Sequence, residues 1–136
     1  MRKIGVDIGK ARIGVAVSDE LGILASPYKT LDAKGLEEDV DVIVSLVQEK
    51  MADTVVLGLP LALDGTDSEI TLYARSFADN LQTKTSAKVV LWDERLTSYE
   101  AEEILKSRKI KDWRERKKLL DQVAASIILQ SYLNVK

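Results

Sequence analysis

The sequence predicts a single α/β domain built around a mixed sheet. Three observations predict it: two glycine-rich segments of alternating apolar residues at the start, a continuous apolar strand in the middle, and amphipathic helices that alternate with strands afterwards. The chain has 136 residues, of which 46% are hydrophobic, and this suits one domain with its own core. It contains no linker, repeat or low-complexity stretch, so residues 1–136 are expected to form one domain.

The first strands are predicted to form a three-stranded meander. Apolar residues alternate with glycine or polar residues over 4–9 and again over 13–18, which is the period of two that strands show. A turn at 19–22 leads into a third apolar stretch, 23–31, which Pro27 interrupts.

A helix and a buried strand follow the meander. An acidic helix is predicted over roughly 36–51 because apolar residues recur there at helical spacing. Its apolar face comprises Leu36, Val40, Ile43, Val47 and Met51. Residues 54–59 are a continuous apolar run, typical of a strand that is buried on both faces, and they end in the loop GLPLALDG.

The next helix is predicted to begin at a capping box formed by Thr66 and Glu69. Its buried face is expected to comprise Ile70, Tyr73, Phe77 and Leu81. A fifth strand covers 88–92.

A second capping box, Thr97 with Glu100, opens a helix that runs to about residue 107. The last helix spans roughly 114–133. The predicted order of elements is therefore βββαβαβαα.

The chain contains neither histidine nor cysteine. It therefore lacks the commonest general base, the usual partner of a catalytic triad, any disulfide and any thiolate zinc site. Chemistry would have to rely on carboxylates, lysine, tyrosine, hydroxyl groups or an oxygen-bound metal such as Mg²⁺ or Mn²⁺. No apolar run approaches the roughly 20 residues that a membrane helix needs, so we expect no membrane partner and a cytoplasmic location.

Positive charge is concentrated in one segment. Residues 106–118 hold eight Lys or Arg and two acidic residues, whereas the whole chain has a net charge of −2. Because Lys and Arg supply phosphate contacts and Trp113 lies among them, this segment is a candidate for binding a polyanion. A solvated, charge-rich junction between helices is an equally good interpretation.

Four carboxylates lie at positions of the predicted strands and the last helix where a ligand could bind. Asp7 interrupts an apolar strand and shares a face with Gly5 and Gly9, so we expect the space beside it to be open to a ligand. Asp93 and Glu94 follow the fifth strand directly.

Asp121 lies on the flank of the last helix that faces inward. Like charges gathered from these elements would not all stay ionised without a divalent cation. If these carboxylates lie together in the fold, they would supply the metal ligands that two-metal hydrolysis of a phosphodiester needs.

Four ordered blocks then carry a family resemblance. They are VDIGKARIGVAVSD, VVLGLPLALDGTDS, DERLTSYEAEEIL and LDQVAASIILQSYL, and together they extend over nearly the whole chain. The sequence resembles the YqgF/RuvX-type family of RNase H-like nucleases, whose members are described as Holliday junction resolvases and as nucleases that mature pre-16S ribosomal RNA. The resemblance implies an RNase H-like fold (βββαβαβα, a five-stranded mixed sheet flanked by helices), Mg²⁺ or Mn²⁺ dependence and a nucleic-acid substrate.

By this resemblance Asp7, Glu94 and Asp121 are the catalytic, metal-binding carboxylates. The sequence leaves open whether Glu94 or its neighbour Asp93 is the second one. Asp93 could equally orient Arg95 or cap the following helix. The residues expected to contact nucleic acid are Arg12, Arg95, Lys109, Lys111, Arg114 and Lys117. Arg95 could instead form a plain ion pair with its acidic neighbours, and the role of Arg12 stays open.

Three functions remain open at the level of sequence. A metal-dependent nuclease acting on structured RNA or branched DNA is the leading one, and a nucleic-acid-binding module without turnover is the second. The third is a phosphate loop of the actin and sugar-kinase type, which is disfavoured because those proteins need two such domains. Symmetric cleavage of a junction would call for a homodimer, whereas trimming of an RNA end would not.

Overall fold

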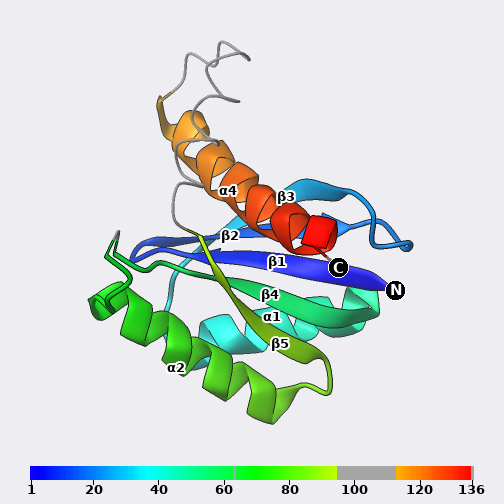
Figure 1. The fold of residues 1–136 in the computed structure, drawn as a ribbon, viewed down its shortest axis with the longest axis horizontal. Coiled ribbons are helices and arrows are strands. Elements are labelled where there is room, and N and C mark those ends of the chain that lie inside the picture. Colours follow the sequence, from blue (N-terminus) through cyan, green and yellow to red (C-terminus); the bar gives the residue numbers. More distant parts are fainter. Residues whose placement is uncertain (63, 95–112, 136) are drawn as a thin grey trace.

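The computed structural model describes residues 1–62, 64–94 and 113–135. Its strands are β1 (Arg2–Ile8), β2 (Arg12–Ser18), β3 (Ala25–Asp32), β4 (Ala52–Leu59) and β5 (Lys88–Asp93). Its helices are α1 (Leu36–Lys50), α2 (Glu69–Lys84) and α4 (Trp113–Val135). The five strands form one sheet in the order β3-β2-β1-β4-β5 (Figure 1), which confirms the predicted α/β class.

The sheet is mixed because the chain first folds as a meander and then crosses over. β1 pairs antiparallel with β2, and β2 pairs antiparallel with β3. β4 pairs parallel with both β1 and β5, with α1 and α2 forming the connections. β1, β3, β4 and β5 therefore run in the same direction. Their last residues, Ile8, Asp32, Leu59 and Asp93, lie at one end of the sheet, which we call the carboxyl end.

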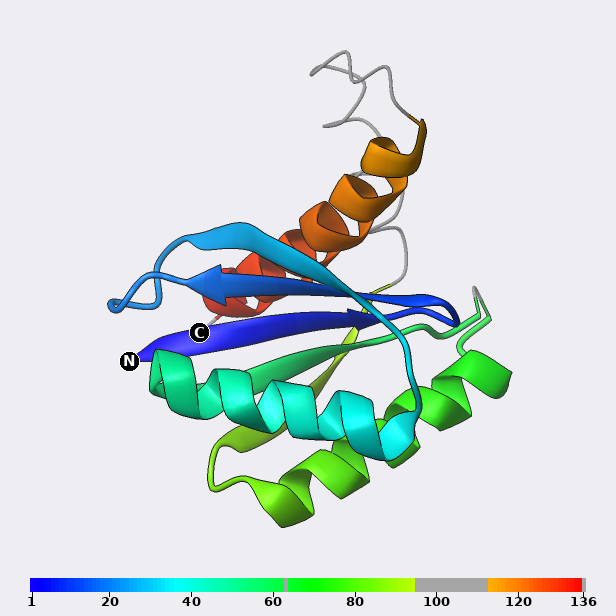
Figure 2. The same cartoon turned by 180° about the vertical axis from the view of Figure 1, so that it is seen from behind.

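Helices α1 and α2 cover one face of this sheet (Figure 2). Ile4, Val6 and Ile8 of β1 point into the core beneath them, because successive side chains of a strand alternate between its faces. Leu57 of β4 and Phe77 of α2 are fully buried in the same core. This layer is the main hydrophobic core of the domain.

The other face is covered by α4, which crosses β1 and β2 (Figure 1). The core on this side is smaller, and it joins Ala16 and Val56 of the sheet to Ala125, Ile128 and Leu129 of the helix. Ala125 and Leu129 are completely buried. The last helix thus packs against the sheet on the face to which Asp7 also belongs.

The predicted helix over 36–51 is observed as α1 with one correction. Met51 was expected on its apolar face, but this residue is 73% exposed and adopts a left-handed conformation with φ 54° and ψ 45°. Its backbone N–H bonds to the carbonyl of Gln48, so Met51 ends the helix. Val40, Ile43 and Val47 are buried, as the pattern predicts.

The predicted start of α2 is also wrong. Thr66 donates to Asp64 Oδ1 over 2.7 Å and belongs to the preceding loop. The N-cap is Ser68, and the reciprocal capping box joins Ser68 to Thr71 rather than Thr66 to Glu69. The Thr71 hydroxyl also donates to the carbonyl oxygen of Pro60 over 2.5 Å, so a tertiary contact selects this capping box.

Two further differences concern the limits of the elements. The third strand begins at Ala25 instead of residue 23, and β4 begins at Ala52, two residues earlier than predicted. The helix predicted between Thr97 and about residue 107 lies outside the described residues. Within the described part of the chain, no helix is both long and apolar enough to cross a membrane.

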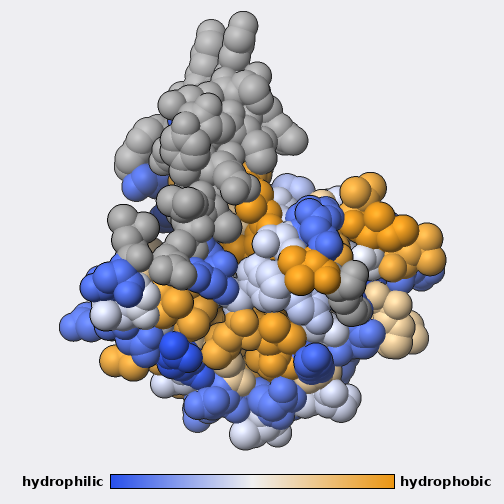
Figure 3. Space-filling view, in the orientation of Figure 1, coloured by the Kyte–Doolittle hydropathy of each residue, from blue (hydrophilic) through white to orange (hydrophobic). Residues whose placement is uncertain are grey.

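Exposed apolar side chains gather at the end of the sheet opposite to the carboxyl end. Leu21, Ile23 and Leu24 of the turn between β2 and β3 are 57–81% exposed. The same turn forms the apolar surface at the right of Figure 3. This apolar surface is therefore separate from the end of the sheet where Asp7 and Glu94 lie.

Candidate active site

Asp7 occupies the penultimate position of β1, on the face that α4 covers. In the register of the sheet it lies opposite Gly14 of β2. Its neighbours Val6 and Ile8 point into the core on the other face. The alternation of a strand therefore directs this carboxylate toward α4, as the sequence predicts.

The glycines near Asp7 make room for protein, which corrects the expectation of open space for a ligand. A Cβ atom at Gly5 would lie 2.7 Å from Leu129 Cβ, and one at Gly14 would overlap the carbonyl oxygen of Asp121. A Cβ atom at Gly58 would overlap Glu94 Oε2. These glycines therefore allow α4 and a second carboxylate to approach the sheet closely.

Gly9 has a different role, in the turn from β1 to β2. Its N–H donates to the carbonyl oxygen of Arg12 over 2.9 Å, and a Cβ atom at Gly9 would lie 2.8 Å from that oxygen. The turn is therefore too tight for a side chain at this position, and it directs β2 back along β1.

Glu94 follows the last residue of β5 and lies beside Asp7. Its N–H donates to the carbonyl oxygen of Leu59 over 3.3 Å, which holds it at the carboxyl end of the sheet. Its Oε2 atom is buried over Gly58. The Glu94 carboxyl group also hydrogen-bonds to the Asp7 carboxylate. Two acidic residues that are 87 positions apart in the sequence are thus in direct contact.

The contact between these carboxyl groups shifts both pKa values upward. Burial raises the pKa of Asp7 to about 6; the hydrogen bond from Glu94 opposes this shift, and the charge of Asp121 adds to it. Burial raises the pKa of Glu94 to about 9, with further contributions from the charge and hydrogen bond of Asp7 and from the charge of Asp93. At neutral pH the two carboxyl groups therefore share a proton.

Asp121 completes the carboxylates that the sequence singled out, and it is bound to Arg12. The Arg12 Nε atom donates to Asp121 Oδ2 over 2.7 Å, and the two side chains are 31% and 21% exposed. Asp121 lies one helical turn before Ala125, which is buried against the sheet. Among the described residues, no three Asp or Glu side chains form a ready set of metal ligands. Asp121 is close enough to affect Asp7 while its own carboxylate binds an arginine.

Asp93 differs from Glu94 in its position. It is the last residue of β5, where it pairs with Leu59, and it is exposed. Its charge raises the pKa of Glu94. The carboxyl group in contact with Asp7 is that of Glu94, a choice between neighbours that the sequence left open.

Comparison with known proteins identifies the family. The profile of the RuvX family, described as Holliday junction resolvase, matches residues 1–135. The chain belongs to the RuvX family.

Curated relatives that match the chain carry the name "Putative pre-16S rRNA nuclease". The relative from Syntrophus aciditrophicus is 45% identical over 134 residues, which cover 98% of this chain and 89% of the relative. The relative from Halothermothrix orenii is 41% identical over 134 residues, which cover 98% and 95% of the two chains. The family resemblance stated from the sequence blocks is thereby confirmed.

Solved structures show the same fold. Thermus thermophilus RuvC in complex with a Holliday junction substrate aligns with a TM-score of 0.63 at 13% identity, over 99% of this chain and 96% of that one. The Fowlpox virus resolvase in complex with Holliday junction DNA aligns with a TM-score of 0.59 at 16% identity, over 99% and 98%. These likenesses concern the fold, and they confirm the predicted RNase H-like class.

The donor atoms of this RuvX-family site fit a hard divalent cation. Asp7 and Glu94 place carboxylate oxygens side by side in a half-buried setting, where they repel each other unless a proton or a cation lies between them. Oxygen ligands of this kind suit Mg²⁺ or Mn²⁺. The contact of Asp121 with Arg12 engages Oδ2, so Oδ1 is the oxygen that could join them.

The residues expected to contact nucleic acid are described only in part. Arg95, Lys109 and Lys111 lie outside the described residues. Arg114 and Lys117 belong to the first turns of α4. Arg12 is part of the site itself through its ion pair with Asp121.

Sequence reasoning missed two features of this RuvX-family site. The first is the role of Gly14 and Gly58, whose lack of a side chain admits Asp121 and Glu94. Their sequence signal was a glycine within each apolar strand, a pattern that often marks a close approach of another group. The second is the ion pair between Arg12 and Asp121, for which no local pattern exists because 109 positions separate them.

Proposed function

We propose that this chain is a metal-dependent nuclease that hydrolyses phosphodiester bonds of structured nucleic acid and processes the ends of pre-16S ribosomal RNA in the cytoplasm. The observation that carries the proposal is the contact between Asp7 and Glu94. Two half-buried carboxyl groups that share a proton are costly to maintain unless a ligand uses them. The names of the curated relatives support RNA as the substrate.

In this proposal Asp7, Glu94 and Asp121 hold Mg²⁺ or Mn²⁺, and the metal supplies charge stabilisation for the scissile phosphate and an activated water. The protein contributes fixed positions for its carboxylates, because β1, the end of β5 and α4 are all held against buried core. Glu94 gives up the proton it shares with Asp7 when the site is occupied. No histidine is needed as a general base, which agrees with the composition.

Arg12 has two roles in the proposed reaction. Its Nε atom neutralises Asp121 before substrate arrives. Its terminal amino groups are the donors that would contact a substrate phosphate, since a guanidinium can serve a carboxylate and a phosphate from different sides. The basic residues Arg95, Lys109, Lys111, Arg114 and Lys117 would hold the rest of the nucleic acid.

The experiment compares a precursor 16S RNA, a synthetic four-way DNA junction and a linear duplex, with Mg²⁺ or Mn²⁺ present. Wild-type protein is measured beside Asp7→Asn and beside Asp79→Asn, a matched change of an exposed aspartate on α2. We expect the precursor ends to be trimmed by the wild type and by Asp79→Asn. The Asp7→Asn variant should be slower by at least about a hundredfold, because one metal ligand is lost.

Each other result points to a specific alternative. Symmetric cuts in the junction, with intact precursor RNA, would replace the RNA assignment with resolvase activity, and light scattering would then have to show a homodimer. Wild-type rates equal to those of Asp7→Asn on all three substrates would overturn the nuclease. Salt-dependent binding that is lost when Lys109, Lys111, Arg114 and Lys117 are neutralised would then favour a binding module.

A further inference from the structure

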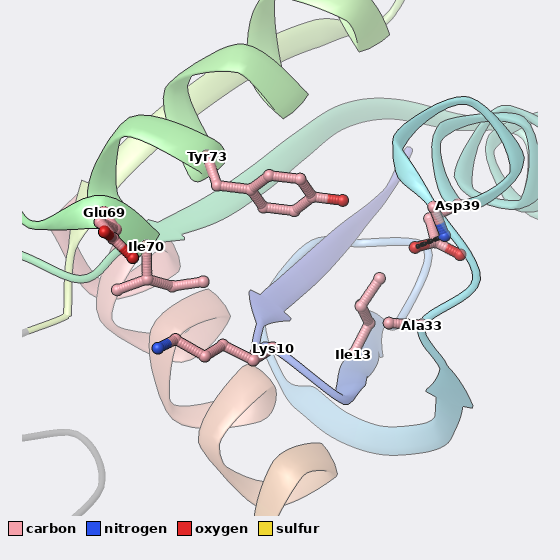
Figure 4. Close-up of a pocket in the computed structure, with 9 residues that line it drawn as sticks. Lys10, Ile13, Ala33, Asp39, Glu69, Ile70 and Tyr73 are labelled. Atoms are coloured by element: carbon pink, nitrogen blue, oxygen red, sulfur yellow. Dashed lines mark hydrogen bonds between the residues drawn. The ribbon is translucent and has the colours of Figure 1, made fainter.

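A cavity opens at the carboxyl end of the sheet, on the face opposite to Asp7. It has a volume of about 400 Å³, within the range of small-ligand sites. Its walls come from the turn after β1, the segment before α1 and the first turns of α1 and α2 (Figure 4). All nine residues that line it belong to the described part of the chain.

The walls of this cavity combine flat apolar surface with a few polar groups. Ile13, which is 1% exposed, and Ile70 provide aliphatic surface beside the ring of Tyr73. Figure 4 shows the Lys10 amino group and the Glu69 carboxylate toward one end, and the Tyr73 hydroxyl directed toward Asp39 at the other end. Such a slot, apolar in the middle and polar at its ends, suits a planar heterocycle.

The charges at the cavity disfavour a phosphate as its occupant. Two carboxylates, Asp39 and Glu69, line it against one cation, Lys10. Asp39 is 3% exposed and accepts hydrogen bonds from the backbone N–H groups of Lys34 and Gly35 at 3.1–3.3 Å. Asp39 therefore fixes the wall of the cavity, and Glu69 is the exposed acidic acceptor. A neutral group that offers hydrogen-bond donors matches this lining better than an anion does.

The cavity lies next to the carboxylate pair along the chain. Lys10 follows Asp7 by three residues, in the tight turn that Gly9 forms. Ile13 pairs with Ile8 in the sheet and shares its face, whereas Asp7 points to the other face. A nucleic-acid strand that crosses this end of the sheet could therefore place a phosphate at Asp7 and Glu94 and an adjacent base in the cavity.

We propose that this cavity binds a single unpaired base of the substrate and prefers guanine, which makes Lys10, Glu69 and Tyr73 specificity-determining residues. The inference rests on the proposed function, since it names what the same substrate presents beside the cleavage site. Guanine carries the donors N1–H and N2–H₂ beside the acceptor O6. The Glu69 carboxylate matches the two donors, the Lys10 amino group matches the acceptor, and the Tyr73 ring stacks on the base.

The Tyr73 hydroxyl contributes a donor at the far end of the cavity. Burial and the charge of Asp39 raise the pKa of Tyr73, so its phenol stays protonated. A purine reaches further into the cavity than a pyrimidine, and this second polar end distinguishes the two classes of base by size. Adenine differs from guanine at the Glu69 end, where it lacks the N1–H and N2–H₂ donors.

The test measures binding of the four nucleoside 5′-monophosphates to the full chain by NMR, with ribose 5-phosphate as the control for the phosphate group. We expect guanosine monophosphate to shift the amide signals of Gly9, Lys10 and Gly35, with an affinity about tenfold above that of adenosine monophosphate. Glu69→Gln should abolish this preference, and Tyr73→Leu should weaken all four nucleotides. Glu49→Gln, a matched change of an exposed glutamate at the far end of α1, should leave binding unchanged.

The result that overturns the inference is the absence of shifts at Gly9, Lys10 and Gly35 with any nucleotide, or shifts that ribose 5-phosphate reproduces. An equal response to all four bases, unaltered by Glu69→Gln, would overturn the preference for guanine. The Asp7→Asn variant separates this inference from the proposed function, because it should lose cleavage and keep nucleotide binding. Binding at the cavity without cleavage by the wild type would retain the base site and reject the nuclease.

Discussion

Arg12 Nε donates a 2.7 Å hydrogen bond to Asp121 Oδ2. An arginine at the start of β2 therefore binds a carboxylate of α4, the helix that covers one face of the sheet. The pair lies beside Asp7, whose pKa the Asp121 charge helps to raise. Arg12 therefore places a positive charge beside a group of acidic side chains. This contact makes the candidate site sensitive to a residue that is not itself acidic.

Replacing Arg12 should destabilise the protein measurably. Arg12→Met keeps much of the aliphatic length but leaves Asp121 without its cation beside Asp7, so we expect the free energy of unfolding to fall by about 1 kcal/mol. Urea denaturation at pH 7 measures the change. Lys84→Met is the matched control, because Lys84 pairs with Asp41 over 3.0 Å on the exposed surface. If both variants lost the same free energy of unfolding, the contact of Arg12 with Asp121 would stabilise the protein no more than an exposed ion pair does.

Gly14 should tolerate no side chain. A Cβ atom there would overlap the carbonyl oxygen of Asp121, so Gly14→Ala must push α4 away from β2. We expect a loss of about 3 kcal/mol in the free energy of unfolding, at the upper end of the cost of overpacking. Cleavage should also fall, because Asp121 moves with the helix.

Gly22→Ala provides the comparison for that prediction. Gly22 has φ 69°, but a Cβ atom there would lie 3.7 Å from its nearest neighbours, Lys3 Cε and the carbonyl oxygen of Met1. This variant should lose only about 1 kcal/mol, from backbone strain, and cleave at the wild-type rate. If Gly14→Ala were no less stable than Gly22→Ala, the close approach of α4 would not be a constraint on this site.

Sequence patterns predict properties of a single strand or helix, but they do not predict how two elements pack at a glycine such as Gly14. Alternation predicted the strands around Asp7 and the face that it occupies, because that property depends on the strand alone. Helical spacing likewise predicted the buried face of α1 from Val40 to Val47. Which atoms fill the space above Gly14 depends on how α4 packs on the sheet, and no local pattern records that.

The choice between neighbouring acidic residues has the same physical origin. Asp93 and Glu94 both follow a buried strand, and only the tertiary contact with Asp7 distinguishes them. The start of α2 was misplaced for a related reason, since the Thr71 hydroxyl is engaged by Pro60. The cavity at Tyr73 was missed because helical spacing assigned that residue to the core, whereas it is only half-buried there.

In metal-free protein, stability should decrease as pH rises. The folded-state pKa values of Asp7 and Glu94 lie near 6 and 9, above the ordinary values of 3.8 and 4.5, so the folded protein binds protons that the unfolded chain releases. The stabilisation is fully present below about pH 4 and is lost as the pH passes 6 and then 9. We expect the free energy of unfolding of the wild type to fall by roughly 1.4 kcal/mol per pH unit between pH 6 and pH 8, where the folded protein holds one proton more than the unfolded chain.

Glu94→Gln tests the origin of that loss. With a neutral amide beside Asp7, the free energy of unfolding should vary less with pH, and at pH 9 the variant should be more stable than the wild type. Urea denaturation with EDTA at pH 5, 7 and 9 gives the comparison, and Asp79→Asn should follow the wild-type curve. A wild-type stability that rises from pH 5 to pH 9 relative to Glu94→Gln would contradict a shared proton.

A divalent cation should replace that proton. Adding Mn²⁺ or Mg²⁺ at pH 7 is expected to raise the melting temperature, and a concentration one hundred times the dissociation constant would add about 2.7 kcal/mol to the free energy of unfolding. Since the pair of Asp7 and Glu94 shares a proton at this pH, binding should release close to one proton per site. Calorimetric titration in two buffers of different ionisation enthalpy measures the protons released.

The same titration on variants identifies the ligands. Asp7→Asn and Glu94→Gln should each lose the shift in melting temperature, whereas Asp79→Asn should keep it, because Asp79 is exposed on α2. Cleavage should stop on addition of EDTA and return with excess Mn²⁺. Proton release that persisted in Glu94→Gln would place the titrating group elsewhere. A melting temperature of the wild type unmoved by either cation would show that the pair of carboxyl groups does not bind metal.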